Sequence, residues 1–182
     1  SDLHNLFFNP ELMRSLPAAT AIGNHDFYYP LYSIRSNHPN RFDRELLQCP
    51  AGKGYYFKRG EALFIVLNSN NVLTYDHEEL IKEAMEFYPD ALWRVVVMHY
   101  SIYSRNEEDN FYRPLFSRIF DKYDIDLVLS GHDHIYTRSA LLCGNERAEN
   151  GGTLYLEAST ASGCNYGGQP DATPWYAEKC IQ

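Results

Sequence analysis

Two continuous apolar runs constrain the fold of this chain more than any other feature. Residues 62–67 and residues 94–98 are apolar almost throughout, without the alternation typical of a strand that has one face in water. Such runs are typical of strands buried on both faces, which occur in sheets that helices cover. The chain is therefore expected to build a central sheet with helices packed against it.

Further strands are predicted around these two runs. Each is a short apolar run bounded by glycine or by a polar turn, at residues 18–22, 55–58, 127–129 and 153–157. Only Arg59-Gly60-Glu61 separates residues 55–58 from residues 62–67, so these two strands are expected to pair as a hairpin.

Two helices are predicted from apolar positions that recur with the helical period. The first spans residues 76–88, where Asp76 and Glu79 form a capping box. The second spans residues 111–123, with Pro114 tolerated in its first turns. The apolar stripe of each helix is expected to lie on the sheet.

The order of these elements predicts an α/β protein, with helices packed on a mixed sheet. The chain has 182 residues, of which 45% are apolar, enough for one ordinary domain with a substantial core. Neither repeats nor a linker divide it. Residues 18–157 are expected to form the core, and residues 158–182, rich in Gly, Asn and Pro, a loop or tail.

Charge and composition exclude several classes of partner. The formal net charge is -8 and the sequence has no Lys/Arg cluster, which argues against nucleic acid or an anionic membrane as the main partner. Every apolar stretch is too short to span a bilayer, so a soluble protein is expected. The even number of cysteines permits two disulfides of open pairing, which favours an exported protein. These cysteines are Cys49, Cys143, Cys164 and Cys180.

Unusual polar residues stand where three of the predicted strands end. Gly23-Asn24-His25-Asp26 follows the first strand, His99 follows residues 94–98, and Gly131-His132-Asp133-His134 follows residues 127–129. A single histidine at a strand end is more often structural, and Asn24 alone could be a turn residue. Sites in open α/β sheets collect at the carboxyl ends of strands, however, and three such endings together favour a shared site.

His132 and His134 are spaced as a pair of metal ligands. In extended chain, residues two apart place their side chains on one face about 6.5 to 7 Å apart, with Asp133 turned away. That spacing suits one ligand to each of two metal ions about 3.5 to 4 Å apart. Imidazole nitrogens and the Asn24 carbonyl oxygen are both legitimate ligands. The candidate ligands are Asn24, His99, His132 and His134.

As a set, these motifs resemble those of the calcineurin-like metallophosphoesterases. Gly-Asn-His-Asp at 23–26, Val96-x-x-His99 and Gly131-His132-x-His134 match the last three motifs of that superfamily in order and spacing. The resemblance covers about residues 18–157.

One branch of the superfamily is favoured by the residues that flank these motifs. The stretch from His132 through Tyr136 to Arg138 is similar to the purple acid phosphatases, and so is Tyr103, four residues after His99. Ser101 stands where that branch usually has proline.

The resemblance implies a metallophosphoesterase fold, which is a mixed β-sheet sandwich flanked by helices, here incomplete at the N-terminus. By that likeness, Asn24, His99 and His132 would bind one metal ion and His134 the other. The complete enzyme would hold two divalent or trivalent ions of iron, zinc or manganese, because nitrogen and oxygen ligands suit all three.

The resemblance also implies a mechanism. Two metal ions would clamp a phosphoryl group and direct a metal-bound hydroxide at phosphorus. His25 would contact the phosphate or protonate the leaving group, with Asp26 orienting it. Tyr103 and Arg105 are candidates for the rim of the substrate pocket.

All four candidate ligands are neutral, so two divalent cations would leave a charge of about +4 with no carboxylate to offset it. The family's first two motifs supply carboxylates and belong before Gly23. Asp2-Leu-His4 imitates the first motif, but no apolar strand leads into it. The chain is therefore expected to be the C-terminal part of one catalytic domain. It would depend on a missing N-terminal part of that domain and hold at most one weakly bound ion alone.

The expected function is hydrolysis of phosphate monoesters of a small phosphorylated substrate, as in acid phosphatases. A phosphodiesterase or nucleotidase of the same superfamily is the nearest alternative, because no specificity pocket follows from the sequence. A non-catalytic fragment that lacks the carboxylate half of the metal site is the alternative from a different class.

Overall fold

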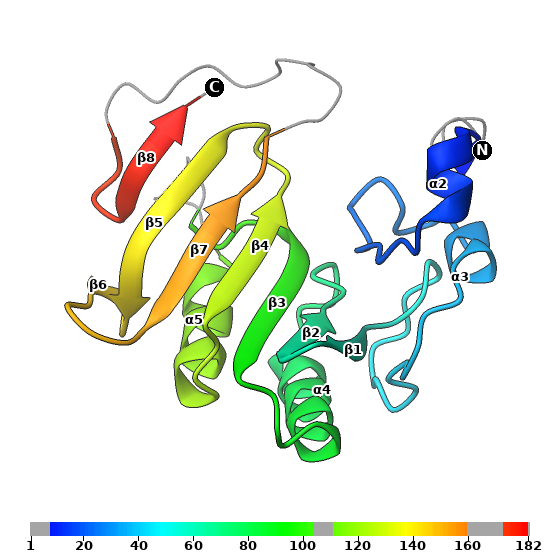
Figure 1. Ribbon diagram of the computed structural model, residues 1–182, viewed down its shortest axis with the longest axis horizontal. Helices are drawn as coiled ribbons and strands as arrows, with labels where there is room; N and C mark the ends of the chain where they lie inside the picture. The colour runs from blue at the N-terminus through cyan, green and yellow to red at the C-terminus, as the bar shows by residue number, and fades with distance from the viewer. Residues whose placement is uncertain (1–7, 104–110, 160–172, 182) are drawn as a thin grey trace.

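The computed structural model describes residues 8–103, 111–159 and 173–181. They form one mixed sheet of eight strands, in the order β1-β2-β3-β4-β7-β5-β6, with β8 paired to β5 (Figure 1). The strands are β1 (Tyr55–Arg59), β2 (Ala62–Val66), β3 (Trp93–Tyr100), β4 (Leu127–Gly131), β5 (Tyr136–Cys143), β6 (Glu146–Arg147), β7 (Thr153–Glu157) and β8 (Ala177–Ile181). The helices are α2 (Glu11–Ser15), α3 (Leu31–Arg35), α4 (Thr74–Phe87) and α5 (Arg113–Lys122).

The predicted strands and helices of the sheet region are confirmed. β1 and β2 form the expected antiparallel hairpin, in which Gly60 takes a φ of 60° at the turn. β2, β3, β4 and β7 then run parallel. β5 is antiparallel to β7, so the sheet is mixed. The carboxyl ends of the four parallel strands therefore share one edge of the sheet.

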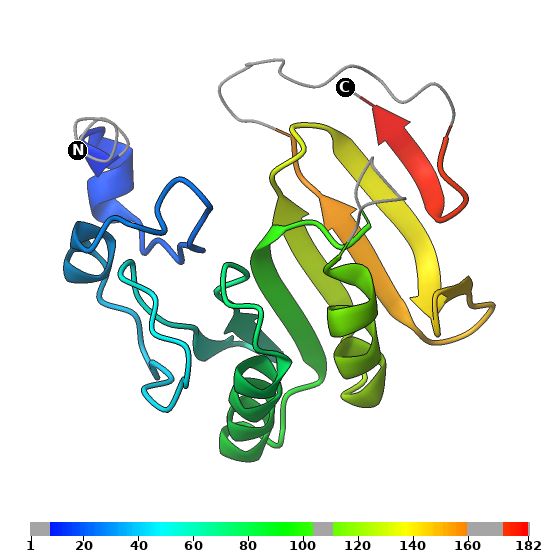
Figure 2. The ribbon, with the colours of Figure 1, turned by 180° about the vertical axis from the view of Figure 1, so that it is seen from behind.

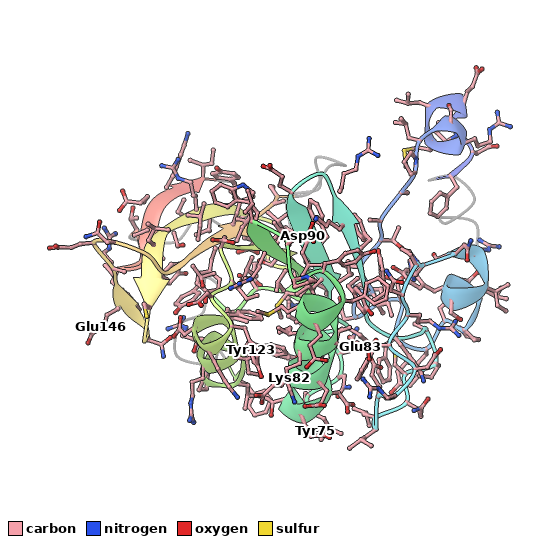
Figure 3. The ribbon with its side chains drawn as sticks, turned by 60° about the horizontal axis from the view of Figure 1, so that its bottom comes forward. Tyr75, Lys82, Glu83, Asp90, Tyr123 and Glu146 are labelled. Carbon is pink, nitrogen blue, oxygen red and sulfur yellow. The ribbon has the colours of Figure 1, made fainter. Side chains whose placement is uncertain are left out.

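Both long helices cover the same face of the sheet (Figure 2). Ile65, Val96, Val128 and Tyr155 lie in register across four strands and are buried in the main core. Leu80, Ile81, Phe116 and Phe120 from α4 and α5 belong to the same core. Tyr123 lies between α5 and α4 (Figure 3), where its hydroxyl donates to Glu78 Oε1 at 2.9 Å.

The opposite face of the sheet is apolar but half-exposed. Val97, Leu129 and Leu156 lie in register on that face, and each is partly accessible to solvent. The described residues build a single sheet, so the second sheet of the expected sandwich is not among them. The chain is therefore an α/β protein, as predicted, with a mixed sheet whose one face is covered by helices (Figure 2).

Two local predictions are wrong. Residues 18–22 form no strand, because no described strand pairs with them, and Tyr55 Oη donates to the Thr20 carbonyl at 3.0 Å. Asp76 does not cap α4. The helix begins two residues earlier, and the buried Asp76 carboxylate accepts the backbone N–H groups of Leu46 and Leu47 at 2.9 to 3.1 Å.

The tail prediction is partly corrected. Within residues 158–182, β8 pairs antiparallel with β5, although its sequence lacks a clear apolar alternation. Among the described residues, no helix combines the length and apolar character needed to cross a bilayer. Cys49, Cys143 and Cys180 are free thiols, so the described part of the chain contains no disulfide that would support export.

Candidate metal centre

Three of the predicted ligands meet at the shared edge of the sheet. Asn24 Oδ1 lies 2.8 Å from His99 Nε2, and His132 Nδ1 lies 3.1 Å from the same His99 nitrogen. Asn24 comes from the turn that follows residues 18–22, His99 from the end of β3, and His132 from the turn after β4. Asn24 and His132 are 75 and 33 positions from His99 in the sequence. The fold nevertheless brings the Asn24 oxygen and the His132 nitrogen next to the His99 nitrogen.

The Asn24 turn is closed by its own residues and by the loop after β2. Asp26 N donates to the Gly23 carbonyl at 3.1 Å, and the Asp26 carboxylate accepts Gly23 N–H at 3.0 Å. Asn70 Nδ2 donates to the same Gly23 carbonyl at 3.3 Å. A Cβ atom at Gly23 would lie 3.3 Å from the His99 ring, so glycine lets the turn approach this histidine closely.

His99 is aimed at Asn24 by an irregularity in β3. The pairing of β3 with β4 shifts register between Val97 and Tyr100, which frees backbone groups from the ladder. The buried Ser69 hydroxyl accepts the N–H groups of His99 at 3.2 Å and Tyr100 at 3.0 Å. Ser69 therefore holds the end of β3 where the candidate ligand projects.

His132 and His134 do not lie in extended chain, so the predicted geometry of this pair is wrong. Their φ angles are 85° and 60°, both in the left-handed region that non-glycine residues rarely adopt. The reason is topological. β4 is parallel to β7 and β5 is antiparallel to it, so residues 132–135 must reverse the chain within four residues.

His134 lies near the three meeting side chains. Its carbonyl accepts the Ser159 hydroxyl at 3.2 Å. A positive charge on its ring would lower the pKa values of both His99 and His132, which puts it within electrostatic range of both.

Burial lowers the pKa values of both meeting imidazoles, of which His132 is the more exposed. Burial lowers the pKa of His99 to about 4, helped by the neighbouring His132 and opposed by Asp26. Burial likewise lowers the pKa of His132, opposed by the adjacent Asp133. The Tyr100 ring packs edge-on against the His132 ring with centroids 4.5 Å apart, and supplies part of this shielding. Neutral imidazoles have a free lone pair for a metal ion at neutral pH.

His25 and Asp26 stand at the same turn as Asn24. The His25 side chain is exposed, and its charge would lower the pKa values of His99 and His132. Asp26 contributes the hydrogen bond to Gly23 described above. The orientation of His25 by Asp26 stays a prediction.

The substrate-rim prediction for Tyr103 is wrong. The side chain is only 2% exposed and packs between Tyr155 and Tyr176. Its hydroxyl donates to Asn145 Oδ1 at 2.8 Å, in the β5-β6 turn at the end of the sheet opposite the His132 turn. The register shift in β3 and the turn after it direct Tyr103 into the core. Arg105 lies outside the described residues, as do Asp2 and His4.

One residue beside the site was missed by sequence reasoning. Glu157, the last residue of β7, is 2% exposed, and its Oε1 accepts the Asp133 N–H at 3.0 Å. Burial raises the pKa of its carboxyl group to about 9, and Asp133 adds to that effect. The only sequence signal was a carboxylate at the end of an apolar strand, at the edge where the ligands were expected.

The described residues contain no group of three His, Cys, Asp or Glu side chains arranged to hold a metal ion. What they bring together is one amide and two imidazoles. Such a donor set fits a transition-metal ion that prefers nitrogen and oxygen ligands. It lacks the negative charge that two such ions would require.

The known proteins similar to this chain include phosphatases. A family model described as calcineurin-like phosphoesterase matches residues 1–136. A phosphoenolpyruvate phosphatase of Allium cepa is 30% identical over 141 residues, which are 68% of this chain and 28% of that protein. The structure of purple acid phosphatase PPD1 from yellow lupin (Lupinus luteus) seeds has a TM-score of 0.56 at 16% identity, over 74% of this chain and 27% of that one. The chain therefore spans about a quarter of the length of these relatives, and the lupin likeness shows the fold alone.

Proposed function

The chain belongs to the calcineurin-like phosphoesterase family, and from this membership we propose that it carries the amide and imidazole ligands of a metal-dependent phosphoesterase. The reaction proposed is hydrolysis of phosphate monoesters of a small substrate, in the manner of an acid phosphatase. One observation supports this proposal most directly: Asn24, His99 and His132 meet within hydrogen-bonding distance at the carboxyl edge of the sheet.

The chemistry of this donor set suits a metal ion. Burial lowers the pKa of His99 to about 4 and also lowers the pKa of the more exposed His132, so protons compete little for their lone pairs at neutral pH. Iron, zinc and manganese all accept such ligands. Bound metal ions would supply Lewis acidity for the phosphoryl oxygens and for an attacking water.

The carboxylate ligands are proposed to come from residues outside this chain. The three meeting ligands and His134 are neutral, which leaves the charge of two divalent ions uncompensated. The relatives described above are more than three times as long as the matched segment, which leaves room for such residues. In the complete domain we therefore propose two metal ions, with His134 binding the second.

His25 is proposed as the residue that handles the phosphate. It is exposed beside Asn24 and close enough to His99 and His132 for its charge to affect both. From that position an imidazole can hydrogen-bond a phosphate oxygen or give a proton to the leaving group. Asp26 fixes the turn that carries it through the bond to Gly23.

Metal analysis tests the ligand set. After dialysis against Zn²⁺, the 182-residue chain is expected to retain at most one weakly bound ion, and His99→Ala is expected to lose it. His38→Ala is the matched control, because His38 is a half-buried histidine outside the ligand set: it stacks on Tyr55 with ring centroids 4.0 Å apart and lies 3.0 Å from the Thr20 hydroxyl. Two stoichiometric ions on the wild-type chain would refute the shortage of carboxylates. Equal Zn²⁺ retention by His99→Ala would refute the ligand set.

A further inference from the structure

The turn between β4 and β5 holds two histidines in an unfavourable backbone conformation. His132 and His134 both have positive φ angles. For residues other than glycine the left-handed region costs roughly 1 kcal/mol or more per residue, so surrounding contacts must stabilise the turn. The residue between them, Asp133, is the point at which such a contact could act on both.

Glu157 makes that contact. Its Oε1 accepts the Asp133 N–H at 3.0 Å, and the Ser101 side chain hydrogen-bonds the same carboxyl group. Ser130 and Thr137 flank the turn, and Glu157 is paired in the sheet with both of them. It therefore sits between the two limbs of the turn and reaches its middle.

A carboxyl group in this place is costly for the fold. Glu157 is 2% exposed, and a buried polar group destabilises a protein unless its hydrogen bonds are made. An apolar side chain would fill the end of β7 without that cost. What the carboxyl group adds is an acceptor for one backbone amide of the histidine turn.

We propose that Glu157 is a positioning residue of the candidate metal centre, which fixes the Asp133 amide and thereby the placement of His132 and His134. The functional meaning of this assignment rests on the proposed function, because that proposal makes the two histidines ligands. Outer partners of this kind typically change metal affinity about 10- to 100-fold when they are removed.

Two substitutions separate positioning from simple burial. Glu157→Gln keeps an acceptor oxygen, whereas Glu157→Met keeps the volume and removes the acceptor. In a calorimetric titration with Zn²⁺ alone, Glu157→Gln is expected to stay within about twofold of wild-type affinity and Glu157→Met to weaken it at least about tenfold. Equal affinity of wild type and Glu157→Met overturns the assignment.

Glu45 provides the matched control. It is also buried, at 4% exposure, and its Oε1 accepts a backbone N–H, that of Gly54, at 2.7 Å. Its hydrogen bond lies in the loop before β1, away from the histidine turn. Glu45→Met is expected to leave Zn²⁺ affinity within about twofold of wild type, and an equal tenfold loss there would overturn the assignment by showing that any buried acceptor matters.

Amide hydrogen exchange decides the question without metal. In the metal-free chain, the Asp133 amide is expected to be protected in wild type and Glu157→Gln, and to exchange at least about tenfold faster in Glu157→Met. An unprotected Asp133 amide in wild type overturns the assignment even if Glu157→Met fails to fold. Absence of Zn²⁺ binding by wild type would refute the proposed function instead, and the exchange rates would still decide the role of Glu157.

Discussion

Ser69 accepts two backbone amides on one hydroxyl oxygen, and one of them belongs to His99. The register shift in β3 leaves these amides without strand partners, so the hydroxyl replaces the ladder at this point. His99 is thus the candidate ligand, and Ser69 is the residue that stabilises the strand end. The stability of the strand end can therefore be tested without touching a ligand.

Ser69→Ala is expected to lower the free energy of unfolding by about 1 to 3 kcal/mol, because two buried N–H groups lose their acceptor. Urea denaturation followed by circular dichroism measures the change. Ser15→Ala serves as the control, since the exposed Ser15 hydroxyl bonds carbonyl groups of its own helix, α2. This substitution should change the free energy of unfolding little. Equal losses for the two variants would contradict the role given to Ser69.

The meeting of the three candidate ligands could be predicted from the sequence, but the residues that support them could not. Asn24, His99 and His132 each follow an apolar run, and the runs before His99 and His132 form the neighbouring parallel strands β3 and β4, whose carboxyl ends meet at one edge. Ser69 and Glu157 act on residues 30 and 24 positions away, through a register shift and a turn that no local pattern encodes. The predicted place of Tyr103 at the substrate rim is wrong for a similar reason, since Tyr103 follows the register shift between Val97 and Tyr100.

Among the larger elements, the loop before β1 is fixed to the start of α4 by the buried Asp76 carboxylate, and Glu45 joins two parts of the loop itself. Asp76 accepts amides of Leu46 and Leu47, and Glu45 accepts the amide of Gly54. Asp76 is ionised, since these hydrogen bonds and that of Asn71 outweigh burial and lower its pKa. For Glu45 burial dominates and raises the pKa to about 7, with Asp76 adding to the effect and Lys53 opposing it.

This loop predicts a pH dependence of stability. An unfolded Glu45 releases its proton near pH 4.5 and the folded one near pH 7, so its contribution is complete below pH 4.5 and is lost as the pH rises to about 7. Glu45→Gln lacks this titration. As the pH rises from about 4.5 to about 7, the unfolding free energy of wild type should therefore fall relative to that of Glu45→Gln by on the order of 2 kcal/mol. Parallel curves of unfolding free energy against pH would contradict the assignment.

The elements that sequence reasoning missed have physical causes as well. Residues 18–22 have strand-like composition, but no described strand pairs with them, and the Tyr55 and Asn70 side chains bond the carbonyl groups of Thr20 and Ile22 instead. β8 was read as tail because its side chains are largely polar. It is held by backbone pairing with β5, by Ala177 in the main core and by the bonds of Arg147 to Glu178 and to the Ala177 carbonyl.

For the whole molecule, the main asymmetry is that helices cover one face of the sheet and leave the other half-exposed (Figures 1 and 2). The exposed face is built from the apolar runs that predicted a doubly buried sheet. We propose that the remainder of the domain, which also supplies the carboxylate ligands, packs on this face. The same docking would then complete the core and the metal centre together.

Neighbouring residues of β4 test this asymmetry. Val128 is 2% exposed on the helix-covered face, whereas Leu129 is half-exposed on the other. In the chain alone, Val128→Ala is expected to cost about 2 kcal/mol of unfolding free energy, and Leu129→Ala less, although it removes more carbon. Thermal or urea unfolding measures both. A larger loss for Leu129→Ala would mean that the open face is already covered.

The left-handed backbone at His132 and His134 limits how this site could be redesigned. Asparagine and aspartate enter that conformation more readily than most residues, whereas β-branched side chains are strongly disfavoured there. An engineer who wished to exchange imidazole for a harder oxygen donor, and so shift the preference of the centre toward manganese or magnesium, would find aspartate compatible with the turn. Threonine, though also an oxygen donor, is β-branched and would strain the backbone of the turn.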